Sequence, residues 1–170
     1  MEAAEAHLKG EQQTIWLEKL EQELENLRAA LDWLIAHEQV ELALRFCGAL
    51  WRFWRLYGYW SEGRRWLEAA LGLSYFGEPI PARAWALCVA GDLAYYQDDN
   101  DAARYYLEES VQLSRKFQSE GKLVIALCSL GILLHMPTTH ALAHALLPIN
   151  SSKSKTSLEH NEYSNACRTL

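Results

Sequence analysis

Aromatic and arginine side chains alternate between Trp51 and Trp60, and these residue types could bind a charged ligand. The string reads W-R-F-W-R-L-Y-G-Y-W, with Arg45 before it and Arg64 and Arg65 after it. Guanidinium groups bind carboxylates and phosphates, and aromatic rings stack on nucleobases or form apolar walls. The string could bind single-stranded nucleic acid or an acidic peptide. Alternatively, its aromatic residues fill a helix interface, because residues three and four apart share one helical face.

The net charge of the chain disfavours binding to single-stranded nucleic acid. The chain of 170 residues carries 16 Lys and Arg against 22 Asp and Glu, a formal net charge of −6. Affinity for nucleic acid depends on massed basic side chains that neutralise phosphates. A small helical nucleic-acid-binding protein that uses the stripe 45–66 is therefore the alternative hypothesis, and nucleic acid is not the partner we expect.

The patterns that mark catalytic, cofactor and metal sites are missing from the sequence. It has no G-x-x-x-x-G-K-[ST] for phosphate, no G-x-S-x-G for acyl transfer and no H-E-x-x-H for zinc. His140 and His144 are four residues apart, but no third ligand lies near them. We expect no enzyme activity, no cofactor and no metal.

Cysteine spacing and hydropathy bear on the compartment. Cys47, Cys88, Cys128 and Cys167 form no C-x-x-C pair, and no charged leader with an apolar core opens the chain. The most apolar stretch, Leu123–Leu134, is shorter than the roughly 20 residues that span a bilayer. These observations predict a cytoplasmic protein with reduced thiols and no membrane partner.

Hydrophobic periodicity predicts helices along most of the chain. With 9 Gly and 4 Pro, the sequence has too few turn residues for an all-β fold. Thr14 is the predicted N-cap of the first helix. The expected helices are Ile15–Leu34, Val40–Tyr57, Trp60–Leu71, Ala82–Gln97, Asp101–Phe117 and Glu120–His135. Short turns join them, so we predict antiparallel helix hairpins, with a longer loop at Gly72–Pro81.

The sequence repeats itself at a spacing of 40 residues. A-L-C-V-A-G-D-L at Ala86–Leu93 returns as A-L-C-S-L-G-I-L at Ala126–Leu133. Arg64, Leu67 and Glu68 return as Arg104, Leu107 and Glu108. Two helices per unit at a fixed spacing define an α-solenoid, here an all-α array of about three helix pairs.

The pattern within each unit resembles that of tetratricopeptide repeats, in which small residues lie where two helices cross and large ones fill the gaps beside them. Trp51 departs from the glycine expected at that position of the first unit. The residues that carry the resemblance are Leu87, Ala90, Gly91, Ala94, Ala103, Leu107 and Ser110 in the central unit, with Cys47, Leu50, Trp54, Gly63, Leu67 and Ala70 before them and Leu127, Leu130, Gly131 and Leu134 after.

A narrower resemblance covers residues 12–135. The strings W-L-E-K-L-E-Q-E-L-E-N-L-R-A-A-L-D-W-L, A-L-W-R-F-W and W-S-E-G-R-R-W-L-E-A-A-L are similar to the repeat arm of bacterial multidomain signal-transduction ATPases, which combine a P-loop ATPase, a winged helix and tetratricopeptide repeats. The resemblance implies a regulatory, non-catalytic scaffold linked to transcription. Its implied partner is a protein or peptide, or an ATPase module missing from this chain.

In such an array the first helix of each pair lines the concave side, where a partner segment would bind. We therefore expect a partner-binding groove that is basic at one end and aromatic further on. Its predicted residues are Arg45, Arg52 and Arg55 in one unit and Trp85, Asp92, Tyr95 and Tyr96 in the next. This groove suits an acidic segment or a free C-terminal carboxylate.

Three segments are expected along the chain: a flexible segment at 1–12, the repeat domain at 13–135 and a low-complexity tail at 136–170 that is disordered or frameshifted. The frameshift hypothesis rests on the third unit, which loses its second helix after His135. Its first helix then has nothing to cover Leu127, Leu130 and Leu134, so this end of the array is expected to self-associate.

Overall fold

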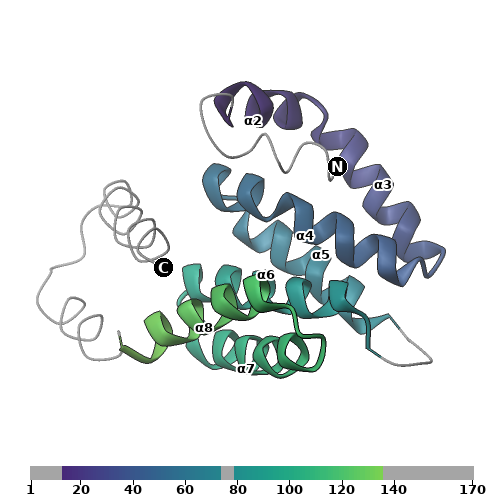
Figure 1. Ribbon diagram of the computed structural model, residues 1–170. Helices are drawn as coiled ribbons and strands as arrows, with labels where there is room; N and C mark the ends of the chain where they lie inside the picture. Colours follow the sequence, from purple (N-terminus) through teal and green to yellow (C-terminus); the bar gives the residue numbers. More distant parts are fainter. Residues whose placement is uncertain (1–12, 74–78, 136–170) are drawn as a thin grey trace, which may run out of the picture.

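The computed structural model describes residues 13–73 and 79–135, which form helices and short connections with no strand among them (Figure 1). The helices are α2 (Gln13–Gln22), α3 (Leu24–Ala36), α4 (Val40–Tyr57), α5 (Trp60–Gly72), α6 (Pro81–Tyr96), α7 (Asn100–Lys116) and α8 (Glu120–His135). The predicted all-α fold is confirmed. The predictions for 1–12 and 136–170 lie outside the described residues, as does most of the loop predicted at Gly72–Pro81.

The N-terminal helix differs from its prediction in two ways. It is divided at Glu23, although backbone hydrogen bonds continue across the division, from Glu23 to the Lys19 carbonyl at 3.1 Å and from Leu27 to the Glu23 carbonyl at 2.9 Å. The break is thus a change of direction rather than a loop. Thr14 is the second residue of α2, so its prediction as the N-cap is wrong.

Four of the turns between helices each contain one residue in the left-handed backbone conformation. Glu38, Gly58, Asp98 and Gln118 each follow a helix by one or two residues and have positive φ values of 51°, 77°, 62° and 52°. After Glu38, Asp98 and Gln118, the backbone amide of the next residue donates to the carbonyl five residues before it. The three hydrogen bonds run from Gln39 to Leu34, from Asp99 to Ala94 and from Ser119 to Ser114, at 2.8 to 3.0 Å. This is the Schellman arrangement, which satisfies the last carbonyls of a helix and reverses the chain. The turns are spaced by multiples of 20 residues, which gives the pair-to-pair period of 40.

Helix α6 lies at the centre of the stack and contacts α4, α5, α7 and α8 (Figure 1). Its side chains supply two cores. Ala86, Val89 and Leu93 join the core formed with α4 and α5, whereas Cys88 and Ala94 join the core formed with α7 and α8. A helix buried on two sides is apolar all round, which the sequence of α6 already shows. The hairpins α4/α5 and α6/α7 thus form two complete units, with α3 on one side and α8 on the other.

None of the helices in the described ranges is both long enough and apolar enough to cross a membrane.

Candidate partner-binding site

Two helices from neighbouring hairpins bring arginine and aromatic side chains together. We call this set the Arg–aromatic cluster; it consists of Trp51, Arg52, Arg55, Trp60, Trp85 and Tyr96. Trp51, Arg52 and Arg55 come from α4, Trp85 and Tyr96 come from α6, and Trp60 begins α5. All are partly exposed except Trp51, which is 9% exposed. The cluster is thus a surface feature anchored on one buried indole.

The arginines lie over aromatic rings. The Arg52 guanidinium is 4.9 Å from the centre of the Trp51 ring, and that of Arg55 is 5.5 Å from the same ring. The Arg55 guanidinium is also 5.8 Å from the ring centre of Tyr96, which lies on α6, the first helix of the following hairpin. Such contacts contribute about 0.5 to 2 kcal/mol each, more where water is excluded. They orient both positive charges over the Trp51 ring.

Trp85 connects the two first helices at the other side of Trp51. Its ring meets the Trp51 ring edge-on at 5.8 Å, and its Nε1 donates to the Gly48 carbonyl at 3.0 Å. A Cβ atom on Gly48 would lie 2.4 Å from the Trp85 ring. The close approach of this indole therefore requires glycine at position 48.

Tyr96 lies against Trp60, with stacked rings 5.4 Å apart. The Trp60 Nε1 donates to the Arg55 carbonyl at 3.1 Å, and Tyr95 meets Tyr96 edge-on at 5.9 Å. The two tyrosines thus extend the aromatic surface along α6 beyond the arginines.

The predicted site residues divide into three groups. Arg52, Arg55, Trp85, Tyr95 and Tyr96 are linked by contacts with Trp51 or with one another. Arg45 is exposed near the start of α4, where it pairs with Glu41 at 3.8 Å. Asp92 is only 4% exposed, so it lies in the packed interior of α6 and cannot line a groove.

The aromatic residues of the string 51–60, predicted to fill a helix interface, are divided between the core and the surface. Phe53 and Trp54 are buried core residues, at 0% and 1% exposure, as expected of interface-filling side chains. Tyr57 is 38% exposed, and Trp60 is part of the Arg–aromatic cluster rather than of the core alone. Trp51 was recognised only as a departure from glycine. Its spacing of four residues from Arg55 is the signal that could have placed it beside that guanidinium group.

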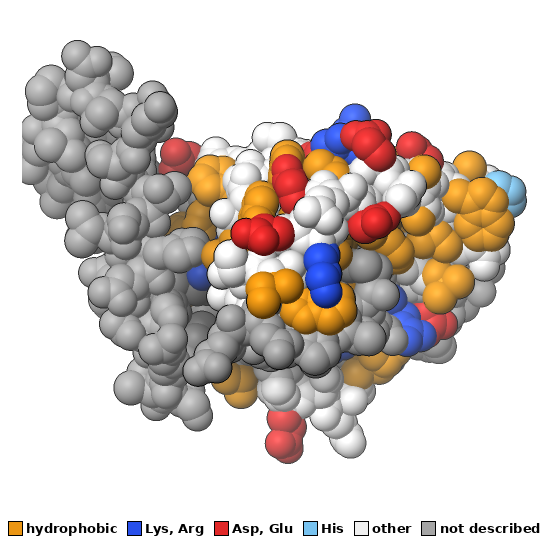
Figure 2. Space-filling model, turned by 90° about the horizontal axis from the view of Figure 1, so that it is seen from above, with side chains coloured by type: hydrophobic (Ala, Val, Ile, Leu, Met, Phe, Trp, Pro, Cys, Tyr) orange, Lys and Arg blue, Asp and Glu red, His pale blue; other side chains and the backbone are white. Residues whose placement is uncertain are grey.

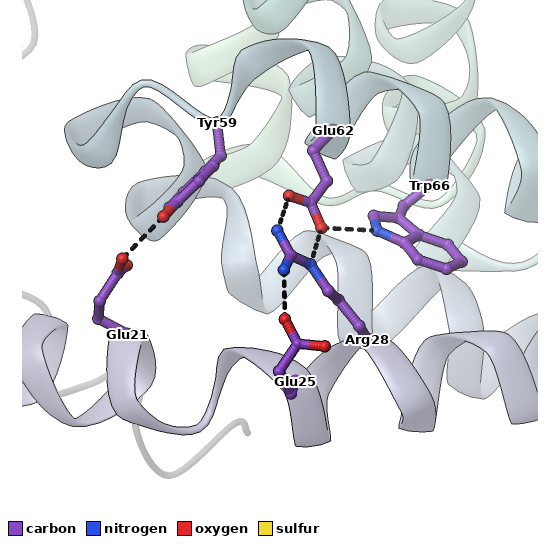
Figure 3. Close-up of polar contacts among 6 residues, drawn as sticks. All are labelled: Glu21, Glu25, Arg28, Tyr59, Glu62 and Trp66. Carbon is purple, nitrogen blue, oxygen red and sulfur yellow. Dashed lines mark hydrogen bonds and ion pairs between the residues drawn. The ribbon is translucent and has the colours of Figure 1, made fainter.

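A separate polar contact joins α3 to α5 on another side of the stack (Figure 3). The Arg28 guanidinium donates to both Glu62 carboxylate oxygens at 2.6 Å and to Glu25 at 2.6 Å, while Trp66 Nε1 donates to Glu62 at 3.3 Å. The hydrogen bond from Arg28 lowers the pKa of Glu62. The same pairing raises the pKa of Arg28, because Glu62 and Glu25 stabilise its charged form.

The structure contains a hollow beside this contact, between α3 and α5, of about 600 Å³. Glu25, Arg28, Ala29, Asp32, Ile35, Arg65, Trp66 and Ala69 line it. Figure 2 looks onto the α2–α3 side of the molecule, where acidic and apolar side chains are interspersed and apolar ones gather at one end beside a histidine. The hollow is thus of mixed chemistry and lies on different helices from the predicted groove.

The described cysteines and acidic or histidine side chains offer little scope for nucleophilic or metal chemistry. Cys47, Cys88 and Cys128 form no disulfide bond, and burial raises the pKa of Cys47 to about 12. A thiol with so high a pKa is a poor nucleophile at neutral pH. Within 13–73 and 79–135, no group of three or more His, Cys, Asp or Glu side chains could hold a metal ion.

Comparison with known protein families, curated proteins and solved structures yields no match to this chain.

Proposed function

We propose that this chain is a non-catalytic protein-interaction scaffold whose Arg–aromatic cluster binds a carboxylate-bearing segment of a partner protein. The observation that carries the proposal is the position of Arg55, which lies between Trp51 of its own helix and Tyr96 of the next first helix. The cluster is thus shared by two repeat units, as a site for an extended ligand must be.

The chemistry of the cluster supports a carboxylate ligand. Arg52 and Arg55 lie nearly one helical turn apart, so both can reach the same acidic group. Ring contacts hold both guanidinium groups in place before binding, which reduces the entropy lost when a ligand is bound. Trp85 and Tyr96 add apolar walls for the side chains that flank the carboxylate.

The broader role follows from the resemblance described above. We infer that the chain is the tetratricopeptide-type arm of a transcription-linked signalling protein of bacteria, working in the cytoplasm, and that its partner is a protein segment or an ATPase module outside this chain. Stacked helix hairpins support this role, because a repeat array presents one continuous surface to an extended partner.

The test is peptide binding by the full chain. Arrays of acidic peptides with free C-terminal carboxylates are probed beside the same peptides amidated, and single-stranded oligothymidine serves as the nucleic-acid probe. We expect binding to free carboxylates, weakened at least tenfold in the Arg52→Gln/Arg55→Gln variant. Arg104→Gln/Arg115→Gln is the matched control, since it removes the same charge from exposed positions of α7.

Equal loss of peptide binding in both double variants would show a diffuse charge effect and overturn the proposal. Binding to oligothymidine alone, with a steep dependence on salt, would instead support a nucleic-acid site.

A further inference from the structure

Helix α8 presents an apolar face to solvent. Val124, Leu127 and Leu134 are 47%, 41% and 52% exposed. They are spaced three and seven residues apart, with Gly131 between the last two, so they share one side of the helix. A Cβ atom added to Gly131 would have open space around it. The face is therefore a contiguous apolar strip with a shallow point at its glycine.

The 40-residue repeat identifies the matching face of α6. Moving back by 40 residues, Val124, Leu127, Gly131 and Leu134 become Ala84, Leu87, Gly91 and Ala94. These four residues are buried in the structure. Helix α7 covers them: a Cβ atom on Gly91 would meet Leu107 at 2.7 Å, and the Ser110 hydroxyl donates to the Ala84 carbonyl at 2.7 Å.

The opposite face of α8 is already occupied. Ala126 and Leu133 are 0% and 6% exposed and belong to the core shared with α6 and α7. Their equivalents on α6, Ala86 and Leu93, pack in the same way against α4 and α5. Each first helix thus has two apolar faces, one toward the preceding unit and one toward its own second helix. Among the described residues, only the first of these faces is covered in α8.

The second helices share a motif on the side that covers this face. It is Gly63-x3-Leu67-x2-Ala70 in α5 and Ala103-x3-Leu107-x2-Ser110 in α7, and all of these residues are buried. The small residue admits a large side chain of the first helix, since a Cβ atom on Gly63 would lie 2.5 Å from Trp54. In α7 the leucine of the motif, Leu107, fills the space over Gly91.

We propose that the exposed face of α8 binds an amphipathic helix of a partner protein that carries the motif small-x3-Leu-x2-small, in the register that α7 takes on α6. The leucine of that helix enters at Gly131. A hydroxyl at the last small position donates to the Val124 carbonyl, as Ser110 does to Ala84. The small first residue makes room for Leu134, which stands where Trp54 and Ala94 stand in the other units.

A peptide with the sequence of α7, Asn100–Lys116, is a probe that carries this motif. Fluorescence anisotropy of the labelled peptide, titrated with the full chain, is expected to show saturable binding. The same peptide with Leu107→Asp is expected to bind at least tenfold more weakly, and with Ser110→Ala a few-fold more weakly.

Chain variants locate the peptide. Leu127→Asp is expected to weaken binding at least tenfold, whereas Leu42→Asp, at a leucine 50% exposed on α4, leaves it unchanged. Neither change disturbs a buried side chain, and circular dichroism verifies folding of both variants. Absence of saturable binding to the full chain overturns the proposal, as does equal loss in both variants. Sedimentation that shows a dimer dissociated by Leu127→Asp but not by the peptide identifies a second copy as the occupant and also overturns it.

Discussion

The hairpins α4/α5 and α6/α7 are equivalent units of the repeat, but their closest side-chain contacts lie at different repeat positions. In α4/α5 the first helix supplies the buried indole of Trp54 and the second supplies Gly63 opposite it. In α6/α7 the first helix supplies Gly91 and the second supplies Leu107 over it. The equivalents of Trp54 and Gly63 are Ala94 and Ala103, and those of Gly91 and Leu107 are Trp51 and Leu67. The side-chain volumes at each crossing thus differ between the units, although both crossings are closely packed.

The faces that carry the Arg–aromatic cluster diverge even more. Arg45, Arg52 and Arg55 of α4 stand forty residues before Trp85, Asp92 and Tyr95 of α6. The first helix thus contributes charge where the next contributes aromatic or buried acidic residues. A repeated backbone that carries different side chains on adjacent units is how one array recognises a particular extended ligand.

The largest expected effect comes from removing the indole at the α4/α5 crossing. Trp54→Ala leaves a cavity at a position 1% exposed and should reduce the free energy of unfolding by about 3 to 5 kcal/mol. Urea denaturation measures it. Trp33→Ala is the control, because Trp33 is 53% exposed on α3 and its loss should cost far less.

A double variant tests whether Trp54 and Gly63 act as one pair. Gly63→Ala alone places a Cβ atom 2.5 Å from the indole and should be strongly destabilising. In the Trp54→Ala background the two positions become the alanines found at positions 94 and 103 of the second hairpin. The added cost of Gly63→Ala should then nearly vanish. Equal costs in the two backgrounds would show that the Trp54 indole does not determine what position 63 can hold.

The next effect compares two glycines forty residues apart. Gly91→Ala should destabilise by about 1 to 3 kcal/mol, because its Cβ atom meets Leu107 at 2.7 Å and the Ala103 carbonyl oxygen at 3.2 Å. Gly131→Ala has open space and should stabilise by roughly 0.5 to 1 kcal/mol, the gain of alanine over glycine within a helix. Thermal melts of both variants measure the shifts. Shifts of the same sign would contradict the difference between the covered face at Gly91 and the open face at Gly131.

Periodicity predicted the helices well because apolar spacing depends on local geometry. The bounds of α4 match the prediction at both ends, and those of α8 do likewise. The division at Glu23 left no signal, since glutamate favours helix and the apolar pattern continues through it. For the site, the pattern placed Arg52, Arg55 and Tyr96 on one face. It could not show that Asp92 is buried, because burial depends on how closely α6 meets its neighbours.

Two ion pairs, Arg28–Glu62 and Arg64–Asp99, should make the free energy of unfolding depend on pH. The pKa of Glu62 is lowered by its hydrogen bond from Arg28, and the pKa of Asp99 is lowered by its hydrogen bond from Arg64. Carboxylates with depressed pKa values stabilise the fold above their ordinary pKa, and that stability is lost as the pH falls through the folded-state value.

Glu62→Gln should therefore lower the urea midpoint at pH 7 and flatten its decline toward pH 3, with the Asp99 contribution left in place. Glu108→Gln, at an exposed position of α7, is the control. An unchanged pH profile for Glu62→Gln would mean that the Arg28 contact does not hold α3 to α5.

The smallest expected effect concerns the turns that join the helices of each hairpin. Gly58 joins α4 to α5 with φ 77°, whereas Asp98 takes the left-handed conformation forty residues later with φ 62°. A Cβ atom on Gly58 would touch nothing within 4 Å, so Gly58→Ala introduces backbone strain alone and should cost roughly 1 kcal/mol. Gln118→Gly, in the turn before α8, relieves the same strain at φ 52° and should stabilise by less than about 1 kcal/mol. A lower thermal midpoint for Gly58→Ala and a higher one for Gln118→Gly would establish that non-glycine residues in these turns carry backbone strain. A lower midpoint for both variants would show instead that the Gln118 side chain supports its turn.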